Sequence, residues 1–156
     1  MLALTMAVVN RGPRLTGEGL ANLASLPKLR HLRVRSGRLS AAGLRQLSRF
    51  TGVEIELGMR GAVAAAQLRE LAKVSGLTTL TLSECQLDDE TVSSLSQITQ
   101  IHHLTLDSAK QRGETLRRLG RLRHLSYIEL ENVHPSDPRV ILDILKRLPD
   151  DRVFVH

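Results

Sequence analysis

The chain has 156 residues, enough for one domain with a sizeable core. Hydrophobic residues make up 42% and charged residues 24%, proportions that are ordinary for a globular chain. The net charge of +6 permits attraction to acidic partners or nucleic acid but demonstrates neither, because solvated helix faces also carry arginine. The single cysteine excludes an intramolecular disulfide framework and suits a reducing compartment, so we predict a cytoplasmic protein.

Aromatic residues are scarce. They make up 2% of the chain, namely Phe50, Tyr127 and Phe154, and tryptophan is absent. The core is therefore expected to be aliphatic, built mostly from leucine. The apolar first nine residues have no basic residue before them and are too short to span a bilayer, so we interpret them as a buried strand. No membrane segment is predicted.

Residues 68–87 define a repeating unit. Apolar residues fall at every third position from Leu68 to Leu80, and the spacing then tightens to two at Leu80 and Leu82. A three-residue step suits a helix face that leads into a tight loop, whereas a two-residue step suits a strand with one buried face. Such a unit cannot bury its own apolar face and needs copies on either side.

The copies occur along the whole chain. Candidate strands follow one another at intervals of 23 to 25 residues, a period typical of solenoids. Their first apolar residues are Val8, Leu32, Ile55, Leu80, Leu104, Ile128 and Val153. The first unit is incomplete, because no helix precedes its strand at residues 7–10. The third strand is predicted at 53–57, followed by a turn at 58–61 and an Ala-rich helix start at 62–66.

Helices are predicted between the strands, where leucines recur at helical spacing. Thr16 is placed to cap the first helix, and Ser40 occupies the equivalent place 24 residues later. The polar turn at 107–113 is expected to be looser than the others. Pro138 suits the first turn of the last helix, and Pro149 ends that helix.

The unit resembles a known repeat family. The pattern L-x-x-L-x-L-x-x-(N/C)-x-L, the leucine-rich repeat signature, is matched in full by Leu77, Leu80, Leu82, Cys85 and Leu87. A second unit matches it except at the Asn/Cys position, with Leu29, Leu32, Val34, Gly37 and Leu39. The segments LTGEGLANL, LSAAGLRQL and LDDETVSSL resemble the turn-to-helix part of ribonuclease-inhibitor-like, cysteine-containing and bacterial leucine-rich repeats.

The resemblance covers nearly the whole chain. It implies an α/β fold, a right-handed solenoid or leucine-rich repeat horseshoe, with a concave parallel sheet and convex helices. Residues 1–156 would form a single domain of about six repeats. Family members mostly bind proteins across the concave surface, so the resemblance implies a non-enzymatic protein–protein interaction module.

The sequence also departs from the family pattern. Only one residue of the ladder type occupies the Asn/Cys position, which predicts irregular turns. That position reads Pro13, Gly37, Arg60, Cys85, Ala109 and Val133. No capping motif is visible at the start, and an uncapped solenoid exposes an apolar edge. We therefore expect either a longer protein or self-association through that end.

Outward positions of the strands are candidates for partner binding, because side chains alternate along a strand. If the strands pair in register, three rows of polar side chains form, with Glu56 beside Thr81. The predicted binding residues are Arg33, Glu56, His103, Asp107, Tyr127, Glu129, Glu131 and Phe154. Tyr127 is favoured as an anchor, because Tyr packs a broad area at low entropy cost. Arg33 and Glu56 have an alternative role, since they can simply pair across adjacent strands.

Other chemistry has little support in the sequence. His103, Asp107 and Glu129 could converge, but no metal-ligand spacing accompanies them. Cys85 has no identifiable base or orienting group, so we interpret it as a buried structural thiol. No phosphate-binding loop, zinc motif or catalytic triad is found, and we predict no metal, no cofactor and no catalytic residue.

Two alternative functions remain open. The first is binding of a polyanion through an Arg-rich convex face, although a solvated surface is favoured and nucleic acid is not the expected partner. Its basic residues avoid the leucine positions and are Arg45, Arg49, Arg69, Lys73, Arg117, Arg118, Arg121 and Arg123. The second is a regulatory or substrate-recognition domain of a larger enzyme complex.

Overall fold

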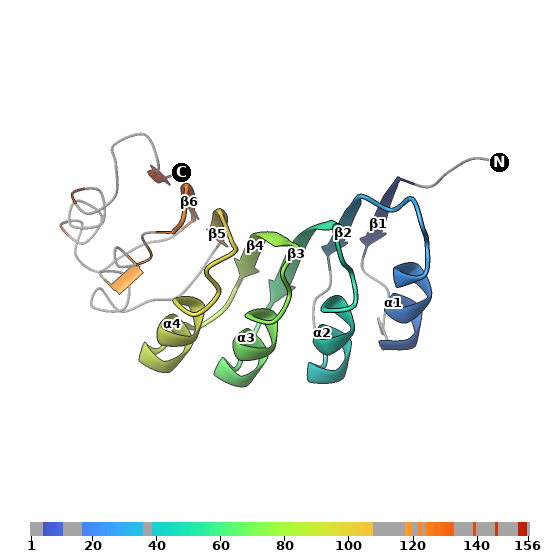
Figure 1. Ribbon diagram of the computed structural model, residues 1–156. Coiled ribbons are helices and arrows are strands. Elements are labelled where there is room, and N and C mark those ends of the chain that lie inside the picture. The colour runs from blue at the N-terminus through green and yellow to red at the C-terminus, as the bar shows by residue number, and fades with distance from the viewer. Residues whose placement is uncertain are drawn as a thin grey trace.

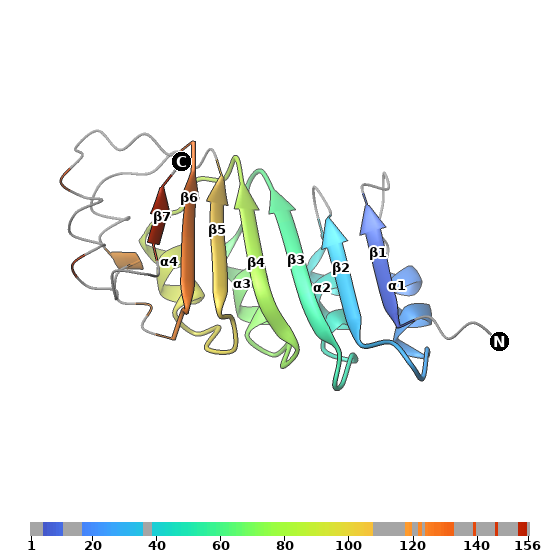
Figure 2. The same ribbon diagram turned by 90° about the horizontal axis from the view of Figure 1, so that it is seen from above.

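The protein is an α/β solenoid with one parallel sheet (Figures 1 and 2). The computed structural model describes residues 5–10, 17–35, 39–107, 118–119, 122, 124–132, 139, 146 and 153–155. Seven strands lie in chain order: β1 Met6–Asn10, β2 His31–Arg35, β3 Glu54–Arg60, β4 Leu77–Ser83, β5 His103–Asp107, β6 Tyr127–Glu131 and β7 Val153–Val155. Within these ranges, four helices cover one face of the sheet: α1 Gly17–Ala24, α2 Ala41–Leu47, α3 Ala65–Leu71 and α4 Asp89–Leu95.

This architecture confirms the predicted fold class. Each described helix connects two neighbouring strands, and every strand pairs in parallel with the next one along the chain. The fold is therefore leucine-rich-repeat-like. Within the described ranges, no helix is both long enough and apolar enough to span a bilayer.

The core is aliphatic, as predicted. In β2, Leu32 and Val34 are buried while their neighbours face outward, and the same alternation recurs in β3 and β6. Helix leucines such as Leu44 and Leu68 meet these strand residues from the other side, so that one hydrophobic cluster runs from β1 to β6. Phe50 is the one aromatic residue among the described members of that cluster. Burial of these aliphatic side chains is the main force that joins neighbouring repeats.

The short helices begin at capping residues. Ser40 Oγ accepts a hydrogen bond from Gly43 N–H at 3.1 Å, and an Asp88 carboxylate oxygen accepts one from Thr91 N–H at 2.8 Å. Ala64 has no capping side chain, and Gln67 Oε1 accepts from its N–H at 2.9 Å instead. Helices of seven residues are marginal alone, so these caps help to define where each one starts.

Glutamine side chains tie consecutive repeats together. Gln67 Nε2 donates to Leu39 O at 2.8 Å, in the repeat before its own. Gln100 Nε2 donates to Leu71 O at 3.0 Å and to Val74 O at 2.9 Å. Leu71 ends α3 and Val74 follows it, so Gln100 gives a further donor to carbonyl groups at the end of a short helix, whereas Leu39 lies just before the cap of α2.

The predicted register between β3 and β4 is wrong. Ile55 pairs with Leu77, but the next residue, Glu56, pairs with Thr79, so Thr78 is an additional residue in β4. Glu56 therefore lies beside Thr79 instead of Thr81. All later residues of β3 are displaced by two positions relative to the prediction.

The predicted turn at 58–61 is also wrong over most of its length. Residues 58–60 continue β3, because Met59 is 3% exposed and pairs with Leu82 in the core. The chain turns at Gly61, whose φ of 84° suits glycine, and α3 begins at Ala65. The predicted cap at Thr16, the loose turn after Asp107 and the last helix lie outside the described residues.

Gly76 allows the close approach at which the register changes. A Cβ atom at this position would lie 2.0 Å from Val53 O, far inside van der Waals contact. Ile55 N–H donates to Gly76 O at 2.7 Å just before β4 begins. Glycine is therefore required at position 76 because there is no room for a Cβ atom, and not because the backbone conformation is unusual.

Replacing Gly76 by alanine should destabilise the protein by roughly 1–3 kcal/mol, because the backbone of residue 53 must move. The matched control is Gly19→Ala in α1, where an added Cβ meets nothing within 4 Å. That control should be stabilised by up to about 1 kcal/mol, since alanine favours helix. Urea denaturation followed by circular dichroism measures both, and equal stability of Gly76→Ala and the unmodified protein would contradict the close approach.

Candidate functional site: the concave sheet face

Outward side chains of the sheet form rows that the observed register defines, and three of these rows make up the candidate site. The first row contains Arg33, Glu56, Thr79, His103 and Tyr127. The second, here named the central row, contains Asn10, Arg35, Gly58, Thr81, Thr105, Glu129 and, by its backbone position, Phe154. The third row contains Arg60, Ser83, Asp107 and Glu131. The two-residue displacement at β4 thus places Arg35 and Glu129 in the same row.

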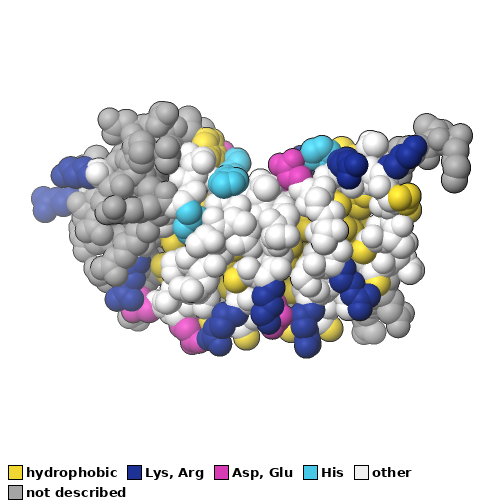
Figure 3. All heavy atoms as spheres, viewed as in Figure 1, with side chains coloured by type: hydrophobic (Ala, Val, Ile, Leu, Met, Phe, Trp, Pro, Cys, Tyr) yellow, Lys and Arg dark blue, Asp and Glu magenta, His cyan; other side chains and the backbone are white. Residues whose placement is uncertain are grey.

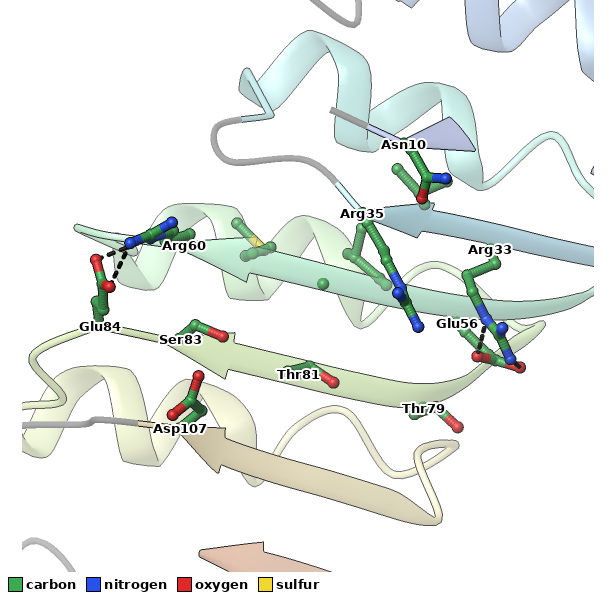
Figure 4. A pocket seen from close by; sticks show the side chains of 14 residues that line it. Asn10, Arg33, Arg35, Glu56, Arg60, Thr79, Thr81, Ser83, Glu84 and Asp107 are labelled. Carbon is green, nitrogen blue, oxygen red and sulfur yellow. Dashed lines mark hydrogen bonds and ion pairs between the residues drawn. The ribbon is translucent and has the colours of Figure 1, made fainter. Parts of the chain in front are cut away.

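The concave face contains a hollow of about 740 Å³ over β1 to β5 (Figure 4). Of the eight predicted binding residues, Arg33, Glu56 and Asp107 line it. The other five lie farther along the sheet on β5, β6 and β7. Polar lining residues that sequence reasoning did not choose are Asn10, Arg35, Arg60, Thr79, Thr81, Ser83 and Glu84.

Gly58 forms part of the floor of the hollow. A Cβ atom there would meet Val34 O at 3.8 Å and Arg35 Cα at 3.9 Å, which is ordinary contact. The backbone therefore does not require glycine at this position. Its missing side chain leaves depth in the middle of the central row. A glycine within a strand often marks a place where another group can approach the backbone. The sequence predicts a turn at 58–61, so it does not reveal this depth.

Arg33 and Glu56 form an ion pair across β2 and β3. Arg33 Nε lies 2.5 Å from Glu56 Oε2, and Nη2 donates to Oε1 at 2.9 Å, so the pair is bidentate. These hydrogen bonds lower the pKa of Glu56 and outweigh the opposing effect of burial, while Arg35 and His31 lower it further. The cross-strand pairing left open by the sequence therefore occurs.

Arg35 differs from the other two arginines of the hollow. Arg60 pairs with Glu84 across β3 and the end of β4, with Nε 2.8 Å from Oε2. The Arg35 side chain makes no hydrogen bond or ion pair with another described residue. It extends from β2 over β3 in Figure 4, in the direction of β4. Arg35 is thus the cation of the hollow that remains available to a ligand.

The β5–β6 end of the face combines an aromatic pair with carboxylates. The His103 and Tyr127 rings meet edge to face with centroids 4.2 Å apart. His103 Nε2 lies 3.9 Å from Glu129 Oε2, and Thr105 Oγ1 donates to the same oxygen at 3.2 Å. Burial raises the pKa of Tyr127, and Glu129 and Glu131 raise it further. Tyr127 therefore keeps its hydroxyl proton at neutral pH.

Metal-binding and nucleophilic chemistry have no geometric support in the described ranges. There, no three His, Cys, Asp or Glu side chains come together in a way that could hold a metal ion. Cys85 is buried, with 1% exposure, and burial raises the pKa of its thiol to about 11. At neutral pH the thiol stays protonated and is a poor nucleophile.

The convex face carries basic side chains along the helices (Figure 3). Several of them lie beside acidic side chains: Arg69 Nη2 is 2.5 Å from Glu90 Oε1, and Arg118 Nη1 is 3.0 Å from Asp89 Oδ2. Lys73 pairs with Glu70 at 3.1 Å. Arg117, Arg121 and Arg123 lie outside the described residues.

Among solved structures, the chain is similar to an internalin from Listeria monocytogenes strain 4b F2365. The TM-score is 0.41 and the sequence identity is 16%. The match covers 86% of this chain and 49% of the internalin chain, so this chain spans about half of the internalin's length. No protein-family model and no curated protein matches the sequence.

Removing Arg33 should raise the pKa of Glu56. In the unmodified protein this pKa lies below its usual value of 4.5, so the pair stabilises the fold above that pH and the contribution is lost as the pH falls through the lowered pKa. Arg33→Gln should raise the titration midpoint of Glu56, because it removes the hydrogen bonds that are the largest cause of the lowered pKa. Carboxyl carbon NMR during acid titration measures this midpoint.

The matched control is Arg35→Gln, which removes a more distant charge and should raise the midpoint by less. An unchanged Glu56 midpoint in Arg33→Gln would show that the bidentate pair does not persist in solution.

Proposed function

We propose that this chain is a protein-interaction module that binds a protein partner on its concave sheet face. The observation that carries the proposal is the hollow of about 740 Å³ in a continuous polar surface made by neighbouring parallel strands. Strand backbones are held by their pairing with neighbours, so outward side chains are presented with little further ordering cost on binding.

The predicted binding residues contribute in two groups. Arg33, Glu56 and Asp107 line the hollow, and Tyr127 with Glu129 extends the surface toward β7. Tyr127 supplies an anchor of the kind that is enriched at binding hot spots. Phe154 continues the central row by backbone position.

The proposal also covers the repeat subtype, the domain organisation, the cellular location and self-association. The repeat subtype is ribonuclease-inhibitor-like, cysteine-containing or bacterial, as the matched motifs suggest, and residues 1–156 form a single domain of this type. The module is non-enzymatic and cytoplasmic, and it acts by recognition alone or within a larger complex. Self-association through an uncapped end remains part of the prediction.

Binding of a polyanion on the convex face is the less supported alternative. Arg69, Lys73 and Arg118 each pair with a carboxylate on or beside a neighbouring helix turn. Such pairing reduces the local positive potential that phosphate groups would require.

Reversing the charges of Glu129 and Glu131 to lysine should abolish capture of the natural partner. Tagged protein expressed in its host cell and analysed by quantitative mass spectrometry measures this, with an expected loss of tenfold or more. Charge reversal in a binding surface places like charges opposite one another, which costs several kcal/mol.

The control is Glu90→Lys, a reversal of the same kind on the convex helix α4. It breaks only an exposed pair with Arg69 and should leave capture unchanged. If both variants retain the partner, or if only the convex variant loses it, the concave face is not the binding surface.

A further inference from the structure

The central row has opposite charges at its two ends. Arg35 lies on β2 and Glu129 on β6, and the residues between them, Gly58, Thr81 and Thr105, are small. No charged side chain therefore interrupts the row between these two. The register change at β4 creates this arrangement, since it brings Arg35 into line with Glu129.

The β2 end offers a cation to an acidic ligand group. Arg35 is exposed and makes no ion pair with another described residue, whereas Arg33 and Arg60 are already bound to carboxylates. A guanidinium donates to a carboxylate in bidentate geometry, and Thr81, the next side chain of the central row after Gly58, carries a hydroxyl that can also donate. This end therefore favours an acidic side chain.

The β6 end offers carboxylates to a basic ligand group. Glu129 accepts a hydrogen bond from Thr105 Oγ1 at 3.2 Å and lies 3.9 Å from His103 Nε2, so two side chains of β5 orient it toward the central row. Glu131 and Asp107 in the adjacent row add negative charge. A lysine or arginine side chain fits this end, with the Tyr127 ring beside it to pack on the stem.

The spacing between the two ends sets the length of the ligand. Arg35 and Glu129 are four strand spacings apart, which is about 19 Å. An extended peptide covers that distance in about six residues. Gly58 lies one strand spacing from Arg35, so the depth there leaves room for a peptide side chain close to the acidic one.

We infer that the occupant of the concave face is an extended protein segment lying across the strands along the central row. It carries an acidic side chain over Arg35 and a basic side chain over Glu129, about six residues apart. This inference rests on the proposed function and adds the chemistry and direction of the ligand.

The test is selection of random twelve-residue displayed peptides on the immobilised full chain. Unmodified protein should enrich peptides with one acidic and one basic residue five to seven positions apart, in a single order. Arg35→Glu should bind those peptides at least tenfold more weakly. Selection on the double variant Arg35→Glu/Glu129→Lys should enrich the opposite order of charges.

Gly58→Val provides the control for location, because it fills the hollow with a residue that favours strands. Peptides lost on Gly58→Val but lacking the spaced charges would overturn the charge inference and leave the proposed function standing. Peptides unaffected by Gly58→Val, Arg35→Glu and Glu129→Lys would overturn the inference, because they bind outside the central row. A selection that enriches nothing overturns the inference, and the pull-down then decides the proposed function separately.

Discussion

Parallel pairing between neighbouring repeats is the constraint on which the rest of the structure depends. A single helix–strand unit buries its leucines only when another unit packs against it, so each strand must align with the next. That alignment also decides which polar side chains meet on the opposite face. At β3 and β4 the bulge at Thr78, next to the close approach at Gly76, accompanies a pairing that differs by two positions from the register predicted from the sequence. The composition of the concave face follows from this one adjustment.

The shift determines the electrostatics of the candidate site. It joins Glu56 to the row of Thr79 and His103, and it joins Arg35 to the row that ends at Glu129. Cross-strand carboxylates then satisfy Arg33 and Arg60, while Arg35 stays available above the glycine floor. In the observed register the central row thus has a positive end at Arg35 and a negative end at Glu129.

Much of the architecture could be predicted because leucine spacing reports burial directly. The period, the parallel order, the aliphatic core and the cap at Ser40 all follow from local residue types. The register of β3 on β4 could not be predicted, because a shift of two residues keeps the same side chains inward and leaves the apolar pattern unchanged. Gly58 also favours a turn by its residue type. Strand β3 continues past it to Arg60 because Met59 is buried in the core. The hollow, and the place of Arg35 beside it, could not be predicted either, because both depend on the register of β3 on β4.

The register of β3 and β4 is therefore the most direct test of this account. Backbone nuclear Overhauser effects in isotope-labelled protein report which residues of adjacent strands lie opposite one another. The account predicts contacts of Glu56 with Thr79 and of Gly58 with Thr81. Contacts of Glu56 with Thr81 instead would contradict it, because Arg35 and Glu129 would then belong to different rows and the hollow would have a different floor.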